Sequence, residues 1–266
     1  MQNILIYSSI ALMKEKPKIA IVAPGGGTGC AYGAGAFTAL AKEYQLRPDI
    51  IVASSGDAGT GVYYTSGQIE ESEKIWTKAL ATTRFIAKRR GLKLMKLDYL
   101  VDTVFRMMHP FDVDSFYSSE IDCYIPITDR KTKGTRYISN RDVKTDSIDM
   151  FEVLRATKSI PVLTQPVTIE GREYEDGSFG ATFDDLIQKA KDLGAEIIIG
   201  IDSRWRKRPI LSQSDERIDI CIVTDRKNPS SPLTSNPQKL RDSFDMGYKS
   251  VLDNPKLKAV LTVKSE

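Results

Sequence analysis

Ser55 stands where a buried strand is expected to meet a helix. The apolar run Ile50–Val52 changes abruptly into the small residues of Ala53-Ser-Ser-Gly-Asp57. A nucleophilic serine needs such a place, because a tight strand-to-helix turn lifts its oxygen off the sheet and small neighbours tolerate the strained backbone. An ordinary turn that merely contains serines has the same composition. The segment alone therefore leaves both interpretations open.

The group that would activate Ser55 is constrained by composition. A histidine usually takes the proton from such a serine. This chain has one histidine, His109, which precedes a proline and is expected to be structural. A carboxylate would then have to act as the base. An aspartate of ordinary pKa is a weak base for a serine, so burial should raise its pKa.

A second turn of small residues, Pro24–Gly29, follows the apolar run at 18–23. A phosphate-binding P-loop is excluded, because no lysine lies between positions 18 and 42. A dinucleotide-binding G-x-G-x-x-G motif is weak, because Cys30 replaces its third glycine. Two interpretations remain: a turn that only needs positive φ, and an oxyanion hole in which backbone N–H groups face a developing negative charge. The candidate oxyanion residues are Gly25, Gly26, Gly27 and Thr28.

Three segments in order carry a family resemblance. They are GGGTGCAYGAGAFTAL from Gly25, DIIVASSGDAGTGVYYTSG from Asp49, and YEDGSFG from Tyr174. Together they resemble the patatin-like phospholipase family, which combines a Gly-rich oxyanion loop, a G-x-S-x-G elbow and an Asp-Gly-Gly/Ala motif. The stretches Ala156-Thr-Lys-Ser-Ile-Pro161 and Phe244-Asp-Met-Gly-Tyr248 are similar to later motifs of that family. The resemblance covers about Pro17 to the end of the sequence.

The resemblance implies a Ser–Asp dyad that works without histidine. Ser55 matches the nucleophile and Asp176 matches its base. Neither a cofactor nor a metal is implied. The other matched positions are the oxyanion residues Gly25, Gly26, Gly27 and Thr28, and the motif-flanking residues Gly56, Asp57 and Gly177.

The sequence departs from the family pattern at two important places. The elbow glycines are replaced by Ala53 and Asp57, and the usual Arg or Lys of the oxyanion loop is Gly29. Asp57 brings a negative charge within a helical turn of Ser55. We expect its carboxylate to cap the elbow helix by accepting backbone N–H bonds, which favours stability and is costly for catalysis.

The elements that must position these residues alternate between strand and helix. Apolar runs predict strands at 18–23, 50–53, 121–128, 135–139, 167–169, 173–174, 196–201 and 218–223. Helices are predicted at 30–42, from the elbow to about 65, from 69 onwards, and at 85–108, 147–158, 183–193 and 240–252. This order predicts an α/β fold, a single three-layer domain with a central, mostly parallel sheet flanked by helices. The glycine loop and Ser55 should then lie at the same sheet edge.

Length and composition fit one domain, which we place at residues 17–266. Three scattered cysteines indicate a reducing compartment rather than a disulfide framework, and the net charge of +3 does not indicate nucleic-acid binding. The apolar stretch 4–13 is too short to span a bilayer and lacks the flanks of a secretory signal. Residues 1–16 are therefore expected to be an N-terminal extension, and the expected location is the cytoplasm.

Two basic segments are candidates for surface contacts. Basic and apolar residues alternate between Arg84 and Met108. Such a segment could contact an anionic membrane, cover an acyl groove as a lid, or simply present a solvated helix face, which is the commonest case. Arg204-Trp-Arg-Lys-Arg208 suits a membrane interface or an exposed basic loop equally well.

These observations predict a serine acyl hydrolase that cleaves lipid-like carboxylic esters, of the phospholipase A or lysophospholipase type. Its partners would be a lipid or ester substrate and no nucleic acid. The alternative is a catalytically weakened relative that binds lipid or a protein partner in the same cleft, which Asp57 and Gly29 favour. A nucleotide-binding module would rest on the glycine loop alone.

Overall fold

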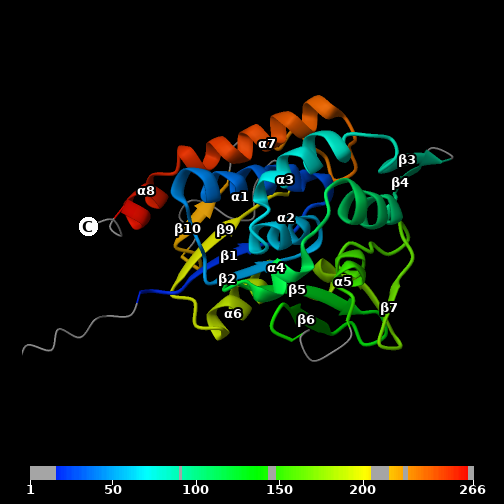
Figure 1. Ribbon diagram of the computed structural model, residues 1–266, viewed down its shortest axis with the longest axis horizontal. Helices are drawn as coiled ribbons and strands as arrows, with labels where there is room; N and C mark the ends of the chain where they lie inside the picture. The colour runs from blue at the N-terminus through cyan, green and yellow to red at the C-terminus, as the bar shows by residue number, and fades with distance from the viewer. Residues whose placement is uncertain (1–15, 90–91, 143–147, 205–215, 224–226, 263–266) are drawn as a thin grey trace, which may run out of the picture.

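The structure is a computed structural model that describes residues 16–89, 92–142, 148–204, 216–223 and 227–262. The expected N-terminal extension therefore lies almost wholly outside the described residues. Within these ranges the chain forms a central sheet with helices on both faces (Figure 1).

The sheet has eight strands in the order β10-β9-β1-β2-β5-β8-β7, with β6 paired to β5. All pairs from β10 to β5 are parallel, whereas β8, β7 and β6 are added antiparallel. The prediction of one α/β domain with a mostly parallel sheet is confirmed. The strands are β1 (Ile19–Ala23), β2 (Ile50–Ala53), β5 (Asp122–Asp129), β6 (Thr135–Ser139), β7 (Val167–Ile169), β8 (Arg172–Asp176), β9 (Ile197–Ile201) and β10 (Ile220–Ile222).

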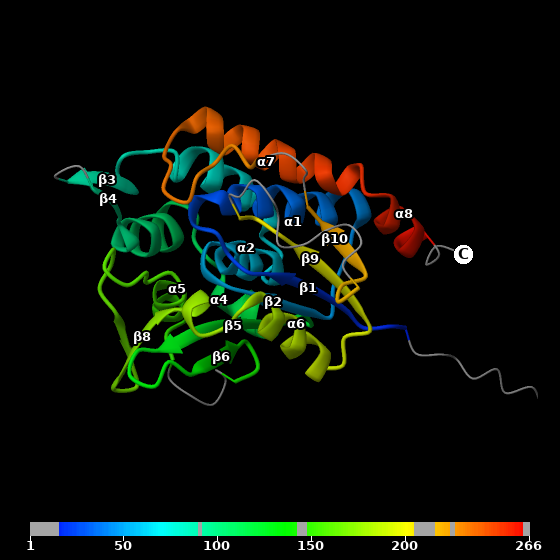
Figure 2. The ribbon, with the colours of Figure 1, turned by 180° about the vertical axis from the view of Figure 1, so that it is seen from behind.

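Alternate residues of the parallel strands serve two cores. In β1, Ile19 and Ile21 pack with the helices on one face, and Ala20 and Val22 pack on the other face. The first face is covered by most of the helices, and the second mainly by α6 (Phe183–Asp192) (Figure 2). The remaining helices are α1 (Ala31–Tyr44), α2 (Ser55–Thr65), α3 (Ile69–Lys74), α4 (Val113–Ser118), α5 (Met150–Ala156), α7 (Pro237–Leu252) and α8 (Pro255–Thr262).

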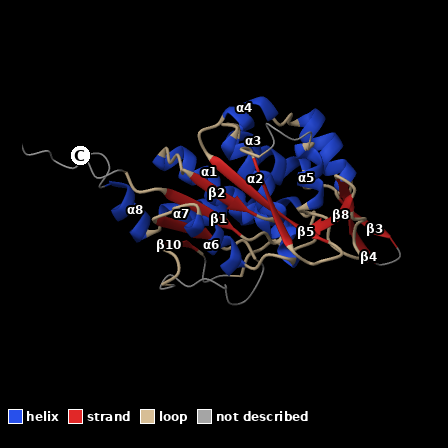
Figure 3. Cartoon of the chain, turned by 90° about the horizontal axis from the view of Figure 1, so that it is seen from below, coloured by secondary structure: helices blue, strands red, loops and turns tan. Residues whose placement is uncertain are grey.

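The edge of β5 brings the candidate residues together. Strand β6 occupies one edge of β5 at residues 124–128, so β2 and β8 must share the other. Strand β2 pairs there only as far as Val52 opposite Tyr124, because the chain then turns into α2. Strand β8 uses the next part of the edge, with Asp176 opposite Ile127. The end of β8 therefore lies near the turn after β2. Figure 3 shows β2, β5 and β8 as red strands from below.

The predicted helix at 85–108 is wrong in its first half. Strands β3 (Ile86–Arg89) and β4 (Leu92–Met95) form an antiparallel hairpin, followed by a π-helical segment at Tyr99–Met108. The stretch Leu92-Lys-Leu-Met95 is short and mainly apolar, and such a run suits a strand as well as a short helix. Helix α8 is not among the predicted helices. None of the helices in the described ranges is long and apolar enough to cross a membrane.

Helices α1 and α7 cross at two glycines without space for a side chain. A Cβ atom at Gly247 would overlap the carbonyl of Tyr32, and one at Gly35 would overlap the carbonyl of Phe244. We expect Gly247→Ala to lower the free energy of unfolding by about 3 kcal/mol, because neither helix can retreat without losing its core contacts. Urea unfolding measures this loss.

The control is Gly134→Ala in an exposed turn, where a Cβ atom would meet only the Thr132 side chain. It should change stability by no more than about 0.5 kcal/mol. Equal losses in the two variants would contradict the close helix crossing.

Candidate active site

Ser55 is the first residue of α2 and has a strained backbone. Its φ of 50° lies in the left-handed region, which is uncommon for a residue with a side chain. Its N–H donates to Thr157 Oγ1 over 3.1 Å, and that hydroxyl donates to the carbonyl of Pro126 over 2.8 Å. These bonds tie the turn to β5 and stabilise a conformation that is unfavourable by itself.

The hydroxyl of Ser55 donates to Asp176 Oδ2 over 2.7 Å. The prediction that the two side chains lie within hydrogen-bond reach is confirmed, while their roles in catalysis stay a prediction. The other carboxylate oxygen, Oδ1, accepts the N–H of Ser178 over 2.9 Å. The backbone N–H of Asp176 donates to Ser159 O over 2.9 Å. Asp176 is thus fixed with one oxygen aimed at Ser55.

Burial raises the pKa of Asp176 above its ordinary value. Hydrogen bonds from Ser55 and Ser178 and the nearby Lys158 cation oppose that rise without cancelling it. A raised pKa makes the carboxylate a stronger base, which is what a serine without a histidine partner requires.

The single histidine lies elsewhere. His109 Nδ1 is 2.7 Å from Glu71 Oε2, and its carbonyl accepts the hydroxyl of Tyr63. It lines neither pocket that reaches Ser55. The expectation that it is structural agrees with these contacts.

Ser178 connects the three sequence motifs. Its hydroxyl lies 3.2 Å from Ser54 Oγ in the elbow and donates to the carbonyl of Pro24 in the glycine loop over 3.2 Å. Its N–H holds Asp176. A glycine or alanine at this position could not form the two hydroxyl contacts, so the serine side chain is what links the elbow to the glycine loop here.

The glycine loop faces the elbow, as predicted. Gly25 has a φ of 87°, and a Cβ atom there would lie 2.7 Å from the Cβ of Ser55. The flanking glycines are equally confined. A Cβ atom on Gly56 would lie 2.6 Å from Cys30 Sγ, and one on Gly177 would overlap the Pro126 carbonyl.

Two of the four candidate oxyanion residues have their N–H groups already bonded. The N–H of Gly25 donates to Asp57 Oδ2 over 3.0 Å, and that of Thr28 donates to Pro232 O over 2.9 Å. Each of these two amides is turned inward and anchors the loop in this structure, and the oxyanion role of the four residues stays a prediction. For Gly26 and Gly27, no partner of the N–H group is found among the described residues. These two are the remaining candidates.

We expected Asp57 to cap the elbow helix, and it does not. Its carboxylate instead accepts the N–H of Gly25 in the glycine loop and the hydroxyl of Ser203 over 3.1 Å. The inward direction is open because Gly33 has no side chain, and a Cβ atom there would overlap Asp57 Oδ1. Complete burial raises the pKa of Asp57 to about 7, against hydrogen bonds from Ser203, Cys30 and Gly25.

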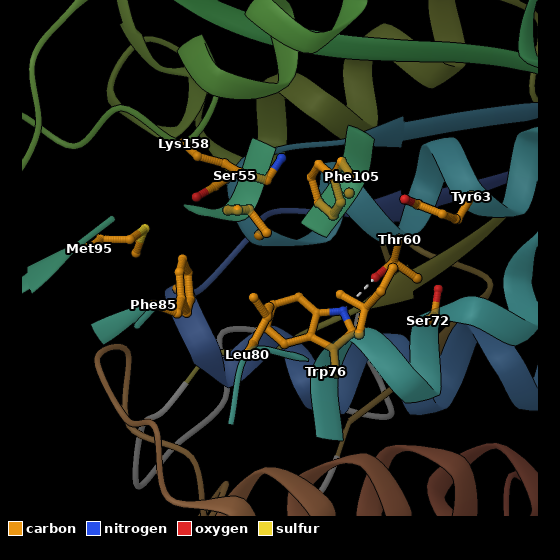
Figure 4. Close-up of a pocket in the computed structure, with 15 residues that line it drawn as sticks. Ser55, Thr60, Tyr63, Ser72, Trp76, Leu80, Phe85, Met95, Phe105 and Lys158 are labelled. Atoms are coloured by element: carbon orange, nitrogen blue, oxygen red, sulfur yellow. Dashed lines mark hydrogen bonds between the residues drawn. The ribbon is translucent and has the colours of Figure 1, made fainter. Parts of the chain in front are cut away.

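Two pockets of opposite character meet at Ser55. The first is narrow, with a cavity volume of about 30 Å³, and its walls are mainly apolar (Figure 4). The second is open, with a volume of about 590 Å³. Ser55 and Gly27 line both. The apolar lining of the narrow pocket comes from Tyr63, Ile75, Trp76, Leu80, Phe85, Met95, Leu100 and Phe105. The open pocket includes Gly25, Gly26, Asp176, Phe179, Phe183, Asp184, Arg204 and Arg217.

The basic segment at 84–108 contributes to the narrow pocket. Phe85 and Met95 flank the β3–β4 hairpin and line the pocket, together with Phe105 of the π-helical segment. The lid interpretation of the segment and its contact with a membrane both stay predictions. Of the basic stretch at 204–208, only Arg204 is among the described residues; it lines the open pocket.

Asp57 should make stability depend on pH. From about pH 4 to pH 7 the folded protein keeps a proton on Asp57 that the unfolded chain has released. The contribution of this group is therefore largest below pH 4 and is lost as pH rises to 7. Asp57→Asn cannot titrate, so the difference in unfolding free energy, wild type minus variant, should fall over that window by a few kcal/mol and level off above it.

Urea unfolding of both proteins at several pH values measures this difference. Asparagine can still accept the N–H of Gly25, whereas Asp57→Ala cannot and should be less stable than Asp57→Asn by about 1–3 kcal/mol. A difference that stays constant with pH would contradict the buried, protonated carboxyl.

Comparison with known proteins places this site in a family. No curated protein sequence matches the chain. Among solved structures, VipD from Legionella pneumophila superposes with a TM-score of 0.54 at 12% sequence identity, covering 92% of this chain and 67% of that one. At this identity the likeness concerns the fold. The family model described as "Patatin-like phospholipase" matches residues 21–186, more than half of the sequence and the part that contains Ser55 and Asp176. The chain therefore belongs to the patatin-like phospholipase family.

Proposed function

We propose that this protein is a serine acyl hydrolase that cleaves lipid-like carboxylic esters with Ser55 as the nucleophile and Asp176 as its base. Family membership implies lipid acyl hydrolysis in general. The observation that carries the specific assignment is the buried Ser55–Asp176 hydrogen bond of 2.7 Å at a strained turn between two pockets.

In the proposed first step, Ser55 Oγ attacks the ester carbonyl carbon and its proton passes to Asp176 Oδ2. The alcohol leaves with that proton, and the acyl group stays on Ser55. A water molecule then attacks the acyl-enzyme, with Asp176 again accepting the proton and returning it to Ser55.

The glycine loop would stabilise the negative charge on the carbonyl oxygen. The N–H groups of Gly26 and Gly27 are the candidate donors, since those of Gly25 and Thr28 anchor the loop. Preorganised backbone donors are effective here because they need no rearrangement as charge develops. Asp57 supports this role from behind by holding Gly25.

The two pockets divide the substrate. The narrow apolar pocket suits the acyl group, and the open pocket, which contains Arg204 and Arg217, suits the alcohol part. A volume of about 30 Å³ has room for about two water molecules. The pocket thus favours a short acyl group over a long one, and a long chain requires side chains such as Met95 to move.

The assignment is tested with a fluorophosphonate probe and a series of carboxylic esters. We expect wild-type protein to be labelled, and Ser55→Ala to lose labelling and at least about 10³-fold of its ester turnover. Asp176→Asn keeps the size of the side chain and loses the base, so turnover should fall by about 10²–10⁴-fold.

The matched control is Ser54→Ala, which removes the neighbouring hydroxyl that contacts Ser178 and not Asp176. It should still be labelled. Absence of labelling and turnover in the wild type would favour a protein that binds lipid or a partner in this cleft, and labelling that survives Ser55→Ala would place the nucleophile elsewhere.

A further inference from the structure

The narrow pocket beside Ser55 contains two polar groups that its apolar walls do not satisfy. Among the described residues, Lys158 Nζ and Ser72 Oγ are both buried without a hydrogen-bond partner. Both residues line this pocket, and Figure 4 places Lys158 close to Ser55 and Ser72 on the α3 side. A plain hydrocarbon chain would leave both groups unsatisfied.

Lys158 is the more costly of the two. It is only 4% exposed, and burial lowers its pKa to about 8, so it still carries its charge at pH 7. Its Nζ lies 5.9 Å from the centre of the Phe105 ring, and a Cβ atom on Gly59 would lie 3.9 Å from it. The ring face attracts the cation, but Lys158 Nζ has no hydrogen-bond partner among the described residues. An uncompensated buried cation costs several kcal/mol, so its retention needs a reason.

Three titratable side chains act on Lys158 from a distance. Asp176, Cys30 and Asp57 affect it electrostatically, with Asp176 first among them, and desolvation still outweighs all three. Among the groups of the protein itself, Lys158 therefore acts mainly as a counter-charge for Asp176. That role uses its charge and leaves its three donor hydrogens unused.

Ser72 lies in α3 and is 1% exposed. Its hydroxyl is a second donor in the same pocket, which Trp76 also lines. The indole N–H of Trp76 already donates to Thr60 Oγ1 over 3.1 Å. A ligand with an acceptor oxygen beside Ser55 would satisfy Lys158, and Ser72 offers a second donor on the α3 side of the pocket (Figure 4).

We propose that the acyl group bound by this pocket is short and carries a carboxylate that Lys158 binds, as in a half-ester of a short dicarboxylic acid. This inference rests on the proposed function and names the substrate class of the same site. The small volume limits the length of the chain. The cation selects a carboxylate over other acceptors, because a charge-assisted bond in a low dielectric is the strongest available. Lys158 is then a specificity-determining residue.

The test compares phenyl esters in pairs of equal chain length. The half-esters of succinic, glutaric and adipic acid are set against butyrate, valerate and hexanoate at pH 7. The rate with Ser55→Ala protein is subtracted from each, because a neighbouring carboxylate speeds spontaneous hydrolysis. Each pair gives a ratio of kcat/KM values, which we expect to favour the half-ester by at least about tenfold for one chain length in wild-type protein.

Lys158→Met replaces the cation with an apolar side chain of similar length. It should reverse the ratio in favour of the plain ester, whatever change in turnover the two esters share. Lys158→Gln keeps a donor without the charge and should give an intermediate ratio.

Two results would overturn the proposal. The first is a wild-type preference for the plain ester at every length. The second is a ratio that Lys158→Met leaves unchanged, including an equal fall for both esters, which would make Lys158 a counter-charge for Asp176. If plain esters are still hydrolysed in a Ser55-dependent reaction, the assignment as an acyl hydrolase stands. If they are not hydrolysed, both that assignment and the proposed role of Lys158 fail.

Discussion

The hydrogen bond between Ser55 and Asp176 is the contact on which the rest of the site depends. It joins residues 121 positions apart, and it forms only because β2 and β8 use consecutive parts of one edge of β5. Ser55 adopts a left-handed backbone conformation at this position. The glycine loop can approach Ser55 only because Gly25 has no side chain. Thr157, Ser159 and Ser178 hold the two partners in place.

Burial then sets the chemistry of these residues. Asp176, Asp57 and Lys158 are all inaccessible to solvent, and desolvation moves the pKa of each toward the neutral form. For Asp176 the shift gives a better base. For Asp57 it gives a carboxyl that holds the glycine loop and titrates near pH 7. One physical effect thus serves the nucleophile, the loop and the proposed selection of the acyl group.

The sequence was sufficient for the local elements and for the pair of chemical residues. Strand β2 and the start of α2 follow from the change of Ile50–Val52 into small residues. The order of the three family motifs identified Asp176 as the candidate base. It was insufficient where the outcome depends on contacts between distant segments. The direction of Asp57 follows from space left by Gly33, and the unsatisfied state of Lys158 follows from packing against Phe105. The motif at 156–161 is visible in the sequence. Only the structure shows that its Thr157 and Ser159 hold Ser55 and Asp176.

The pH dependence of fluorophosphonate labelling tests the Ser55–Asp176 pair most directly. The second-order rate constant should rise with pH through one ionisation, with a midpoint above the ordinary range for an aspartate, because Asp176 must lose its proton to accept that of Ser55. The midpoint should be the same in His109→Gln and Asp57→Asn, and peptide mass analysis should place the label on Ser55. A rise that disappears in His109→Gln, or a label on another serine, would contradict the account.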